Sequence, residues 1–201
     1  MRLCSYVVKV DSGLAPNPFG GCCTLAVCTP NHMGIKLSKD DWILGTTPKR
    51  LGSKLVYAMK VDEVLHFNDY YHHPHYTNKR PNPLGEWKEM VGDNMYYLSS
   101  QGQWRQAATL LHKEEHEKRK DLKNPYVFIG QHFFYFGESA PALPQTYVDL
   151  MHNRQGCKCN HDSALVNGFI MWLQGCHRPG IYGLPRDRQT FCKSVISCSD
   201  G

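Results

Sequence analysis

The chain lacks several features that would assign it to a common class of protein. It contains no run of about 18 uninterrupted apolar residues, so the sequence predicts no membrane-spanning helix. Its first residues are not a basic stretch followed by an apolar one, so we expect no secretory signal and a cytoplasmic protein. The signatures of P-loop, dinucleotide-binding, nucleophile-elbow and kinase proteins are absent, so nothing supports chemistry driven by ATP or NAD.

Cysteine is the residue type whose number needs an explanation. Nine cysteines occur among 201 residues, and without a secretory signal a framework of disulfides is not expected. Buried thiols, a metal site or a thiol nucleophile remain as explanations. The net charge of +5, with 11 histidines besides, is mildly basic and favours contact with nucleic acid or another polyanion.

Strand patterns dominate the chain. Alternating apolar residues, or runs dense in β-branched and aromatic side chains, predict strands at residues 3–10, 41–47, 55–65 and 126–136. Their order does not alternate with helices. The sequence therefore predicts an α+β fold with a curved or barrel-like antiparallel sheet and few helices.

Helical patterns are fewer. We expect them at residues 67–71, 145–153 and 163–173, and in a segment that begins near Trp104 and ends before Asn124. In that segment Trp104, Ala108 and Leu111 share one helical face. Residues 74–94 are rich in proline, asparagine and glycine, which predicts a long loop.

A proline- and glycine-rich loop near the N-terminus leads to two adjacent thiols. The first strand ends at Asp11, and the loop then carries the chain past Asn17 to Cys22 and Cys23. Its prolines fix φ and its glycines allow close approach to the backbone. Such a loop can hold a carboxylate, an amide and a thiolate around a planar substrate. The simpler interpretation is a structural loop with buried cysteines, because free cysteine is among the most buried residue types.

Two clusters of histidine and cysteine suggest metal binding. The residues Cys157, Cys159, His161 and Cys176 supply enough ligands for one tetrahedral zinc ion, although C-x-C spacing is less usual than C-x2-C. The alternative is a set of unpaired thiols. His112, Glu115 and His116 match the H-x-x-E-H pattern of a zinc peptidase class, but they lie in a charge run that predicts a solvated helix instead.

Aromatic and polar residues elsewhere suggest base recognition. Asp93 and Asn94 lie in a turn, where they either cap the local backbone or read the hydrogen-bonding edge of a base. The aromatic residues that can supply stacking faces are Trp42, Tyr57, Phe67, Trp87 and Tyr96. Taken singly, each is more often a core residue.

Several motifs between residues 3 and 137 together carry a family resemblance. They are Ser5-Tyr-Val-Val, Ala15-Pro-Asn-Pro-Phe, Cys23-Thr-Leu-Ala, Asp40-Asp-Trp-Ile, Leu55-Val-Tyr-Ala-Met-Lys-Val, Gly92-Asp-Asn and Phe133-Phe-Tyr-Phe-Gly. The chain resembles the nucleotide-modification-associated domain 2 family of bacteria and phages. Two of the motifs also resemble PUA-like barrels of the EVE, ASCH and YTH types, although Asp40 stands where those families usually have glycine.

The resemblance implies a fold, a substrate class and partners. The fold would be a PUA-like curved antiparallel sheet or barrel over residues 1–140, with a C-terminal extension, 141–201, packed on it as one unit. The function would be hydration of the nitrile of 7-cyano-7-deazaguanine in DNA to the 7-amido form. Partners would be DNA carrying a modified guanine and other proteins of a DNA-modification cluster. The resemblance leaves open whether the substrate is a free base, a nucleotide or DNA.

Nitrile hydration without a metal needs a nucleophile, an acid and a base. A thiolate of Cys23 or Cys22 would attack the nitrile carbon, and water would hydrolyse the resulting thioimidate to the amide. Cys23 is favoured because it begins one of the matching motifs. Asp11 or Asp93 would act as acid and base, and no cofactor would be required.

The remaining candidate residues would bind the substrate. Asn17 or Asn94 would contact the developing charge or the base edge, and His132 would be a spare proton shuttle. Asp11, Asn17, Asp93 and one thiol are expected to converge on one cleft with Trp42, with Tyr57 as a further stacking face. Phosphate contacts are expected from Lys49, Arg50, Lys79 and Arg80.

Two other functions stay open at this point. A non-catalytic reader of a modified base in DNA or RNA predicts an aromatic cage without a reactive thiol. A zinc-stabilised accessory subunit predicts one bound zinc ion and no base pocket. The enzyme predicts a cysteine of lowered pKa inside the pocket.

Overall fold

The computed structural model describes residues 1–27, 35–152 and 154–188. Contacts divide the chain into two compact units, and each is described by itself below. Unit 1 consists of the described parts of Met1–Val10, Pro30–Glu63 and Gly130–Leu184. Unit 2 consists of the described parts of Asp11–Thr29, Val64–Ile129 and Pro185–Gly201.

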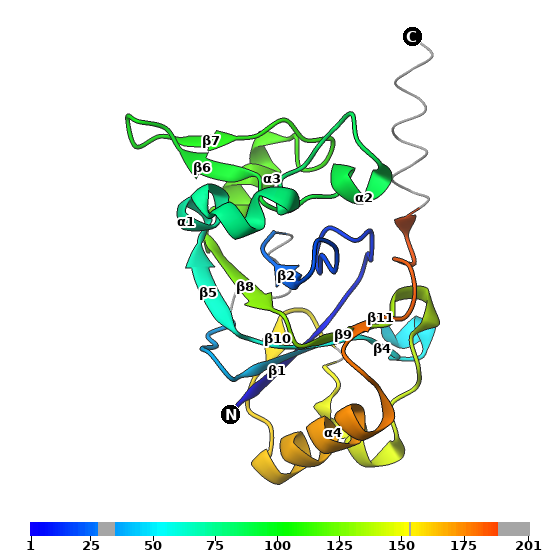
Figure 1. The fold of residues 1–201 in the computed structure, drawn as a ribbon. Coiled ribbons are helices and arrows are strands. Elements are labelled where there is room, and N and C mark those ends of the chain that lie inside the picture. The colour runs from blue at the N-terminus through cyan, green and yellow to red at the C-terminus, as the bar shows by residue number, and fades with distance from the viewer. Residues whose placement is uncertain (28–34, 153, 189–201) are drawn as a thin grey trace. The chain divides into compact units, whose positions relative to one another are not determined.

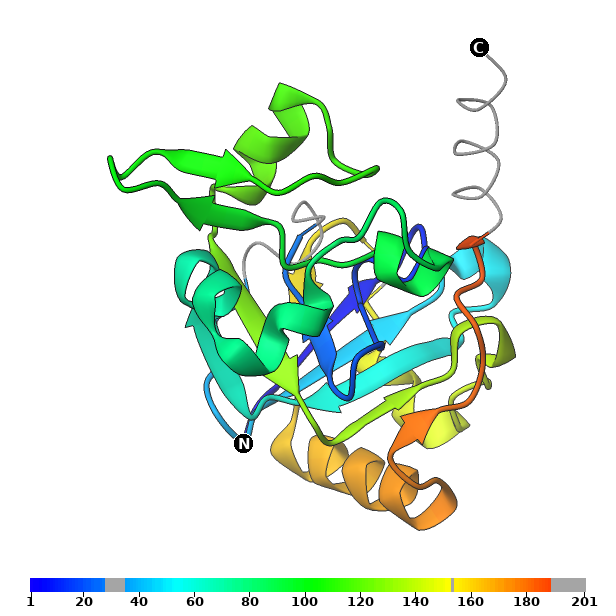
Figure 2. The ribbon, with the colours of Figure 1, turned by 45° about the horizontal axis from the view of Figure 1, so that its top comes forward.

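Unit 1 is built on a six-stranded sheet (Figures 1 and 2). In order across the sheet its strands are β10 (Cys157–Lys158), β1 (Leu3–Val7), β3 (Trp42–Thr46), β4 (Leu55–Lys60), β9 (Phe133–Tyr135) and β11 (Gly180–Ile181). The pairs β1–β3 and β9–β11 are parallel, and the other three neighbouring pairs are antiparallel. The sheet is therefore mixed.

The helix α4 (Ser163–Cys176) supplies the other half of the unit 1 core. Its N-terminus is capped by Asp162, whose carboxylate accepts from the backbone N–H of Leu165 at 2.9 Å. The helix buries Val166, Phe169, Ile170 and Leu173, which recur every three or four residues and so share one face. That face packs against sheet residues that include Trp42, Leu44, Ala58 and Phe134. The 3-10 turns η2 (Lys49–Leu51), η4 (Gly137–Ser139) and η5 (Gln145–Leu150) complete the unit.

Unit 2 combines short strands with short helices (Figure 1). A three-stranded sheet has the order β2 (Cys23–Leu25), β8 (Tyr126–Gly130), β5 (Glu63–His66), and a separate hairpin joins β6 (Tyr96–Leu98) to β7 (Trp104–Gln106). The helical elements are α1 (Phe67–His72), η3 (Pro74–Lys79), α2 (Trp87–Met90) and α3 (Glu115–Asp121). Only the end residues Glu63 and Gly130 of that sheet fall in unit 1.

The helix α1 is fixed to the hairpin by both apolar and polar contacts. The ring of Phe67 stacks on that of Tyr96, with centroids 5.7 Å apart. The backbone N–H of Leu98 donates to the side-chain oxygen of Asn68 at 2.9 Å. These contacts place the first turn of α1 beside β6, and the same two elements carry side chains of the candidate site described below.

Much of the expected architecture is confirmed. The fold is α+β with few helices, and strands occur within 3–10, 41–47, 55–65 and 126–136. The antiparallel, barrel-like sheet is wrong, because the sheet of unit 1 contains two parallel pairs. In the described part of the chain its end strands β10 and β11 each pair on one side only, so no closed barrel forms there.

Two local expectations are also wrong. The predicted loop over 74–94 contains η3 and α2. The segment after Trp104 is the strand β7, and the helix α3 begins only at Glu115. Trp104 pairs with Leu98 of β6 in the hairpin, and this pairing outweighs the helical spacing of the apolar residues.

The N-terminal cysteine is oxidised, which the composition did not suggest. Cys4 forms a disulfide with Cys159, 155 residues away in the sequence.

No helix among the described residues is long and apolar enough to cross a bilayer. The contacts group the described part of Gly130–Leu184 with the N-terminal strand β1, and the predicted division at residue 140 stays a prediction.

Candidate functional site

The candidate site lies in unit 2, where the loop after Asp11 folds back on itself. Asn17 and Thr24 form an isolated antiparallel bridge, and each backbone N–H donates to the other residue's carbonyl at 2.9 Å. The bridge closes a loop that contains Cys22. Carbonyl oxygens of the loop therefore point toward one place in the interior.

A lysine occupies that place. Lys79 is 1% exposed, and its Nζ donates to the carbonyls of Asn17 at 3.0 Å and Cys22 at 2.7 Å. It also lies 3.1 Å from the side-chain oxygen of Asn17 and 3.2 Å from Thr24 Oγ1. Burying an ammonium group is costly unless its donors are satisfied. Here these four partners are neutral oxygens, so the loop is built as a cradle for this cation.

The charge of Lys79 is linked to a carboxylate through a hydroxyl. Thr24 Oγ1 receives a hydrogen bond from Lys79 and donates to Asp93 Oδ2 at 2.5 Å. The hydroxyl of Tyr70 donates to Asp93 Oδ1 at 2.8 Å. We call Lys79, Thr24, Asp93 and Tyr70 the buried network. Its charges are opposite, but a hydroxyl separates them.

Burial shifts the titration of the network. Desolvation raises the pKa of Asp93, and the nearby Lys79 ammonium and two hydrogen bonds oppose that rise. The pKa of Tyr70 is raised well above its usual range, first by burial and then by the Asp93 carboxylate. Tyr70 therefore stays a neutral phenol and acts as a donor.

Both candidate nucleophiles lie beside the network and are shielded from solvent. Cys23 is 0% exposed and Cys22 is 6% exposed. Burial raises the pKa of each thiol, and the Lys79 ammonium only partly opposes the rise. A thioimidate mechanism needs a thiol of lowered pKa, and the raised pKa values of Cys22 and Cys23 do not meet that requirement.

The other unit 2 candidates are held by backbone contacts. The backbone N–H of Asp11 donates to Asp187 at 2.8 Å, and its carboxylate accepts from the backbone of Arg186 at 3.3 Å. Asn94 donates to the carbonyls of Tyr70 and Tyr76 at 3.0 and 2.9 Å. The Oδ1 of Asn94 is buried without a hydrogen-bond partner among the described residues.

Trp42, Tyr57 and His132 belong to unit 1 and are placed there by packing. Trp42 is part of the apolar core and meets the ring of His132 edge-on, with centroids 5.8 Å apart. The hydroxyl of the buried Tyr57 lies 2.9 Å from that of Tyr6. Their convergence with the thiol loop on one cleft stays a prediction.

An aromatic and cationic stack, which sequence reasoning missed, lies on the outer side of unit 2. The rings of Tyr71 and Tyr97 stack with centroids 4.4 Å apart, and the guanidinium of Arg80 lies 4.2 Å from the centre of the Tyr71 ring. Arg105 pairs with Tyr97 across the hairpin. We call Tyr71, Arg80, Tyr97 and Arg105 the outer stack. None of the four is buried.

Three residue doublets join the outer stack to the interior. In Tyr70-Tyr71 and Lys79-Arg80, the first residue belongs to the buried network and the second to the outer stack. In the third doublet Tyr96 is buried and Tyr97 is not. The inward residues hold the segments from which the outward residues project. The doublets were the sequence signal that could have located the stack.

The outer stack also corrects the predicted phosphate contacts. Lys79 was expected at the surface, but it is buried in the network, because the loop carbonyls need a donor. Arg80 is only half-buried, as a surface contact requires. Among the described residues, neither Arg80 nor Arg105 forms an ion pair with a carboxylate.

The H-x-x-E-H pattern separates into unrelated contacts. His112 Nδ1 lies 2.5 Å from the buried carboxylate of Asp121, which also accepts from the hydroxyl of Tyr96 at 3.0 Å. His116 is exposed on α3. The helix is solvated, as its charge run indicates, and His112 lies before its first residue.

The predicted zinc ligands gain no support from the described residues. Cys159 is bonded to Cys4, Cys176 is an exposed free thiol, and His161 Nε2 contacts Ser5 and the carbonyl of Lys158. In the described ranges no three histidine, cysteine, aspartate or glutamate side chains gather in a way that could hold a metal ion. Zinc binding stays a prediction.

Comparison with known proteins adds a family to this geometry. A family model described as nucleotide modification associated domain 2 matches residues 1–193. No curated protein and no solved structure matches the chain. Because the family match spans nearly the whole sequence, the chain belongs to the nucleotide modification associated domain 2 family, and it is a domain associated with nucleotide modification systems.

Proposed function

We propose that unit 2 binds a modified base in nucleic acid through the outer stack. Membership of a nucleotide-modification family supports a nucleic-acid ligand. The observation that carries the proposal is the layered arrangement of Arg80, Tyr71 and Tyr97 beside Arg105. Aromatic faces stack on bases, and guanidinium groups without carboxylate partners neutralise phosphates.

The buried thiols favour binding over catalysis as the leading function. Both cysteines of the loop have raised pKa values, so neither is poised as a thiolate near neutral pH. A reader needs an aromatic surface and no reactive thiol, and the outer stack meets that description. The ligand that we propose is DNA that carries a modified guanine, and membership of a nucleotide-modification family supports a modified nucleotide as ligand.

Binding should be measured by fluorescence anisotropy with labelled single-stranded DNA that contains either guanine or 7-cyano-7-deazaguanine. We expect Tyr97→Ala to weaken binding by roughly tenfold, since base stacking on an aromatic ring is worth about 1–3 kcal/mol. The matched control is Tyr126→Ala, which removes an exposed tyrosine of unit 2 outside the stack. Equal affinities for Tyr97→Ala and the unaltered protein would contradict the proposal.

Phosphate contact by the arginines needs a separate measurement. Arg105→Ala should reduce the dependence of affinity on salt concentration, because a protein that neutralises fewer phosphates releases fewer counterions when it binds. Arg119→Ala, on the exposed face of α3, is the control of the same charge. If both variants keep the salt dependence of the unaltered protein, Arg105 does not contact phosphate.

Hydration of the 7-cyano group is the second candidate function. It is favoured by one observation: Cys22 and Cys23 lie close enough to the Lys79 ammonium for that charge to oppose the rise of their pKa values, and Asp93 is in the same network. The thiol would attack the nitrile carbon, and Asp93 would exchange protons with the nitrile nitrogen and water. No cofactor takes part.

Nucleoside mass spectrometry separates the two functions. DNA containing 7-cyano-7-deazaguanine is incubated with the protein, and the nucleosides are then analysed for the gain of one water. An enzyme gives the amide, with Cys23→Ser abolishing the conversion and Cys22→Ser reducing it only mildly. Tight binding with an unchanged base supports the reader, and conversion that survives both substitutions removes the thiol mechanism.

A further inference from the structure

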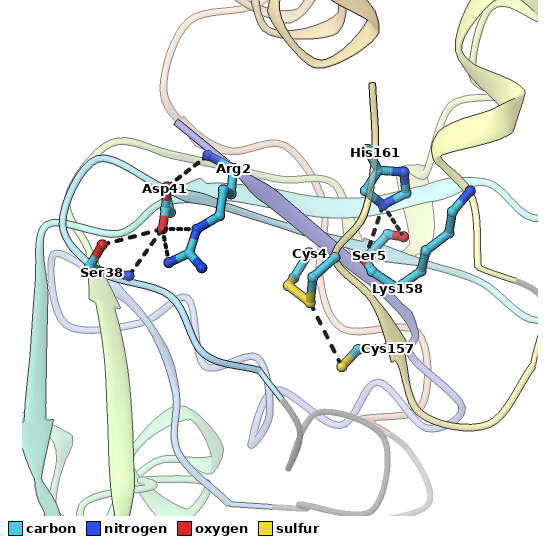
Figure 3. The surroundings of a disulfide bond; sticks show 9 residues. Arg2, Cys4, Ser5, Ser38, Asp41, Cys157, Lys158 and His161 are labelled. Carbon is cyan, nitrogen blue, oxygen red and sulfur yellow. Dashed lines mark hydrogen bonds and ion pairs between the residues drawn. A yellow bond between two sulfur atoms is a disulfide. The ribbon is translucent and has the colours of Figure 1, made fainter. Parts of the chain in front are cut away.

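Three sulfur atoms meet at one edge of the unit 1 sheet (Figure 3). The strands β1 and β10 are antiparallel, with Ser5 opposite Lys158 and Tyr6 opposite Cys157. Continuing that register places Cys4 opposite Cys159, where the two form a disulfide. Cys157 precedes Cys159 by two residues, a spacing that puts both side chains on the same side of an extended chain.

The third sulfur is free and in contact with the disulfide. Cys157 is a free thiol, and its Sγ lies 4.0 Å from the Sγ of Cys159, along the dashed line of Figure 3. Disulfides exchange when a thiolate attacks one of the bonded sulfurs. The attacking sulfur is therefore already held beside its target. Forming the new bond then requires residues 157–159 to leave extended geometry, because a disulfide needs its Cβ atoms about 3.5–4.5 Å apart.

We propose that Cys4, Cys157 and Cys159 form a thiol–disulfide exchange site whose external ligand is a small thiol. In the internal step the Cys157 thiolate attacks Cys159 Sγ. A bond forms between Cys157 and Cys159, the bond between Cys4 and Cys159 breaks, and Cys4 leaves as a thiolate that takes up the proton lost by Cys157. The number of disulfides is unchanged, so no oxidant or reductant is consumed.

Exposure distinguishes the roles of the three sulfurs. Cys4 is fully buried, whereas Cys157 and Cys159 are half-buried. An external thiolate can reach Cys159, form a mixed disulfide with it and release Cys4. Cys157 then attacks Cys159, and the external thiol is regenerated with its proton. The small thiol thus acts as a catalyst of the rearrangement.

The rearrangement would loosen one edge of the sheet. The strand β10 has two residues, and the Cys4–Cys159 bond is its covalent tether to β1. After exchange the noncovalent links that remain include the ladder hydrogen bonds and the contact of His161 Nε2 with Ser5 Oγ at 3.1 Å. A link between Cys157 and Cys159 joins residues two apart in the chain and gives no tether across the sheet.

Tryptic mapping can identify which sulfurs are joined. Trypsin cleaves after Arg2, Lys9, Arg154, Lys158 and Arg186, but not at the Arg178–Pro179 bond, so the three cysteines fall on separate peptides. The peptide of Cys159 also carries Cys176, and Cys176→Ser is therefore the reference protein. It is incubated with glutathione in mildly alkaline buffer, quenched with acid, and alkylated and digested under conditions that suppress exchange. We expect peptide 155–158 linked to peptide 159–186, with Cys4 alkylated.

The matched control is Cys157→Ser in the same Cys176→Ser protein. It keeps the disulfide but lacks the internal nucleophile, so only peptide 3–9 linked to 159–186, or a glutathione adduct, should appear. Release of Cys4 as a lasting free thiol should be at least about tenfold slower than in the reference protein, because a neighbouring thiol has a high effective concentration. If glutathione leaves Cys4 and Cys159 joined in the reference protein, or releases Cys4 equally in both, the exchange site does not exist.

Discussion

The two units secure their interiors in different ways. Unit 1 packs one face of α4 against apolar residues of its sheet and ties the sheet edge with a disulfide. Unit 2 has an apolar cluster too, but it also buries the Lys79 ammonium and the Asp93 carboxylate. Apolar packing tolerates modest changes of shape, whereas a buried charge needs each partner in place. Unit 2 should therefore be the more specific and the more fragile of the two.

The sharpest way to break this comparison is Lys79→Met. The variant leaves the carbonyls of Asn17 and Cys22 without their donor and removes the cation that faces Asp93. We expect a loss of about 3–5 kcal/mol in the free energy of unfolding, as for removal of one partner of a buried charge pair. Urea unfolding measures it, with Arg80→Met as the neighbouring control. A loss below that of the control would show that the network is dispensable.

The next largest effect should fall in unit 1. Gly45 lies opposite Tyr57 across β3 and β4, and a Cβ at this position would clash with the tyrosine ring and with Val8. Gly45→Ala should cost about 1–3 kcal/mol through overpacking. Gly168→Ala is the control, because a Cβ there meets Tyr147 at an ordinary 3.5 Å and alanine favours the helix. Calorimetric unfolding of both variants tests the contrast, and equal losses would oppose it.

A pH titration sharpens the electrostatic side of the comparison. Burial raises the pKa of Asp93 above its ordinary value of 3.8, so the folded protein holds this proton more tightly than the unfolded chain does. Asp93 therefore makes stability decrease as the pH rises from about 4 through the raised value. We expect Asp93→Asn to remove this decrease when urea midpoints are measured across that range. An unchanged slope would mean that Asp93 does not control it.

The smallest expected effect is loss of the α4 cap. Asp162→Ala removes the acceptor for the Leu165 N–H and should cost about 1 kcal/mol, as is typical of N-cap residues. Ser163→Ala, at the first helical residue, should change stability by less. Hydrogen exchange followed by mass spectrometry should show faster exchange in the first turn of α4. Equal exchange in both variants would show that the Asp162 side chain does not stabilise that turn.

The sequence predicted the elements whose apolar residues follow a regular spacing within one segment. The alternation of β4 and the spacing of Val166, Phe169 and Leu173 in α4 are visible in the sequence and are confirmed. The hairpin was missed because its stability depends on the pairing of Leu98 with Trp104, and helical periodicity within one segment does not reveal a pairing between two segments. The disulfide was missed for the same reason, since its cysteines meet only through the register of β1 and β10.

The candidate site was found in part. The sequence identified the loop that carries Asn17, Cys22 and Cys23, and the structure adds the lysine around which the loop closes. A lysine in a polar segment is usually exposed, so its burial could not be read from composition. The outer stack was missed because most of the predicted stacking faces, Trp42, Tyr57, Phe67 and Tyr96, are buried core residues. The fifth, Trp87, is half-buried and meets the ring of Phe19 edge-on.

The pairing of β1 has a consequence for the order in which the protein is made. Its neighbour β3 follows within a few dozen residues, whereas its other neighbour, β10, contains Cys157 and is among the last strands to be synthesised. At about 5–20 residues per second, roughly 8–30 seconds separate translation of the N-terminal strand from translation of this partner. During that interval the edge of the nascent sheet is unpaired at β1 and the Cys4 thiol has no partner strand. A ribosome-bound chain thus carries a free Cys4 thiol, which the finished fold buries in a disulfide.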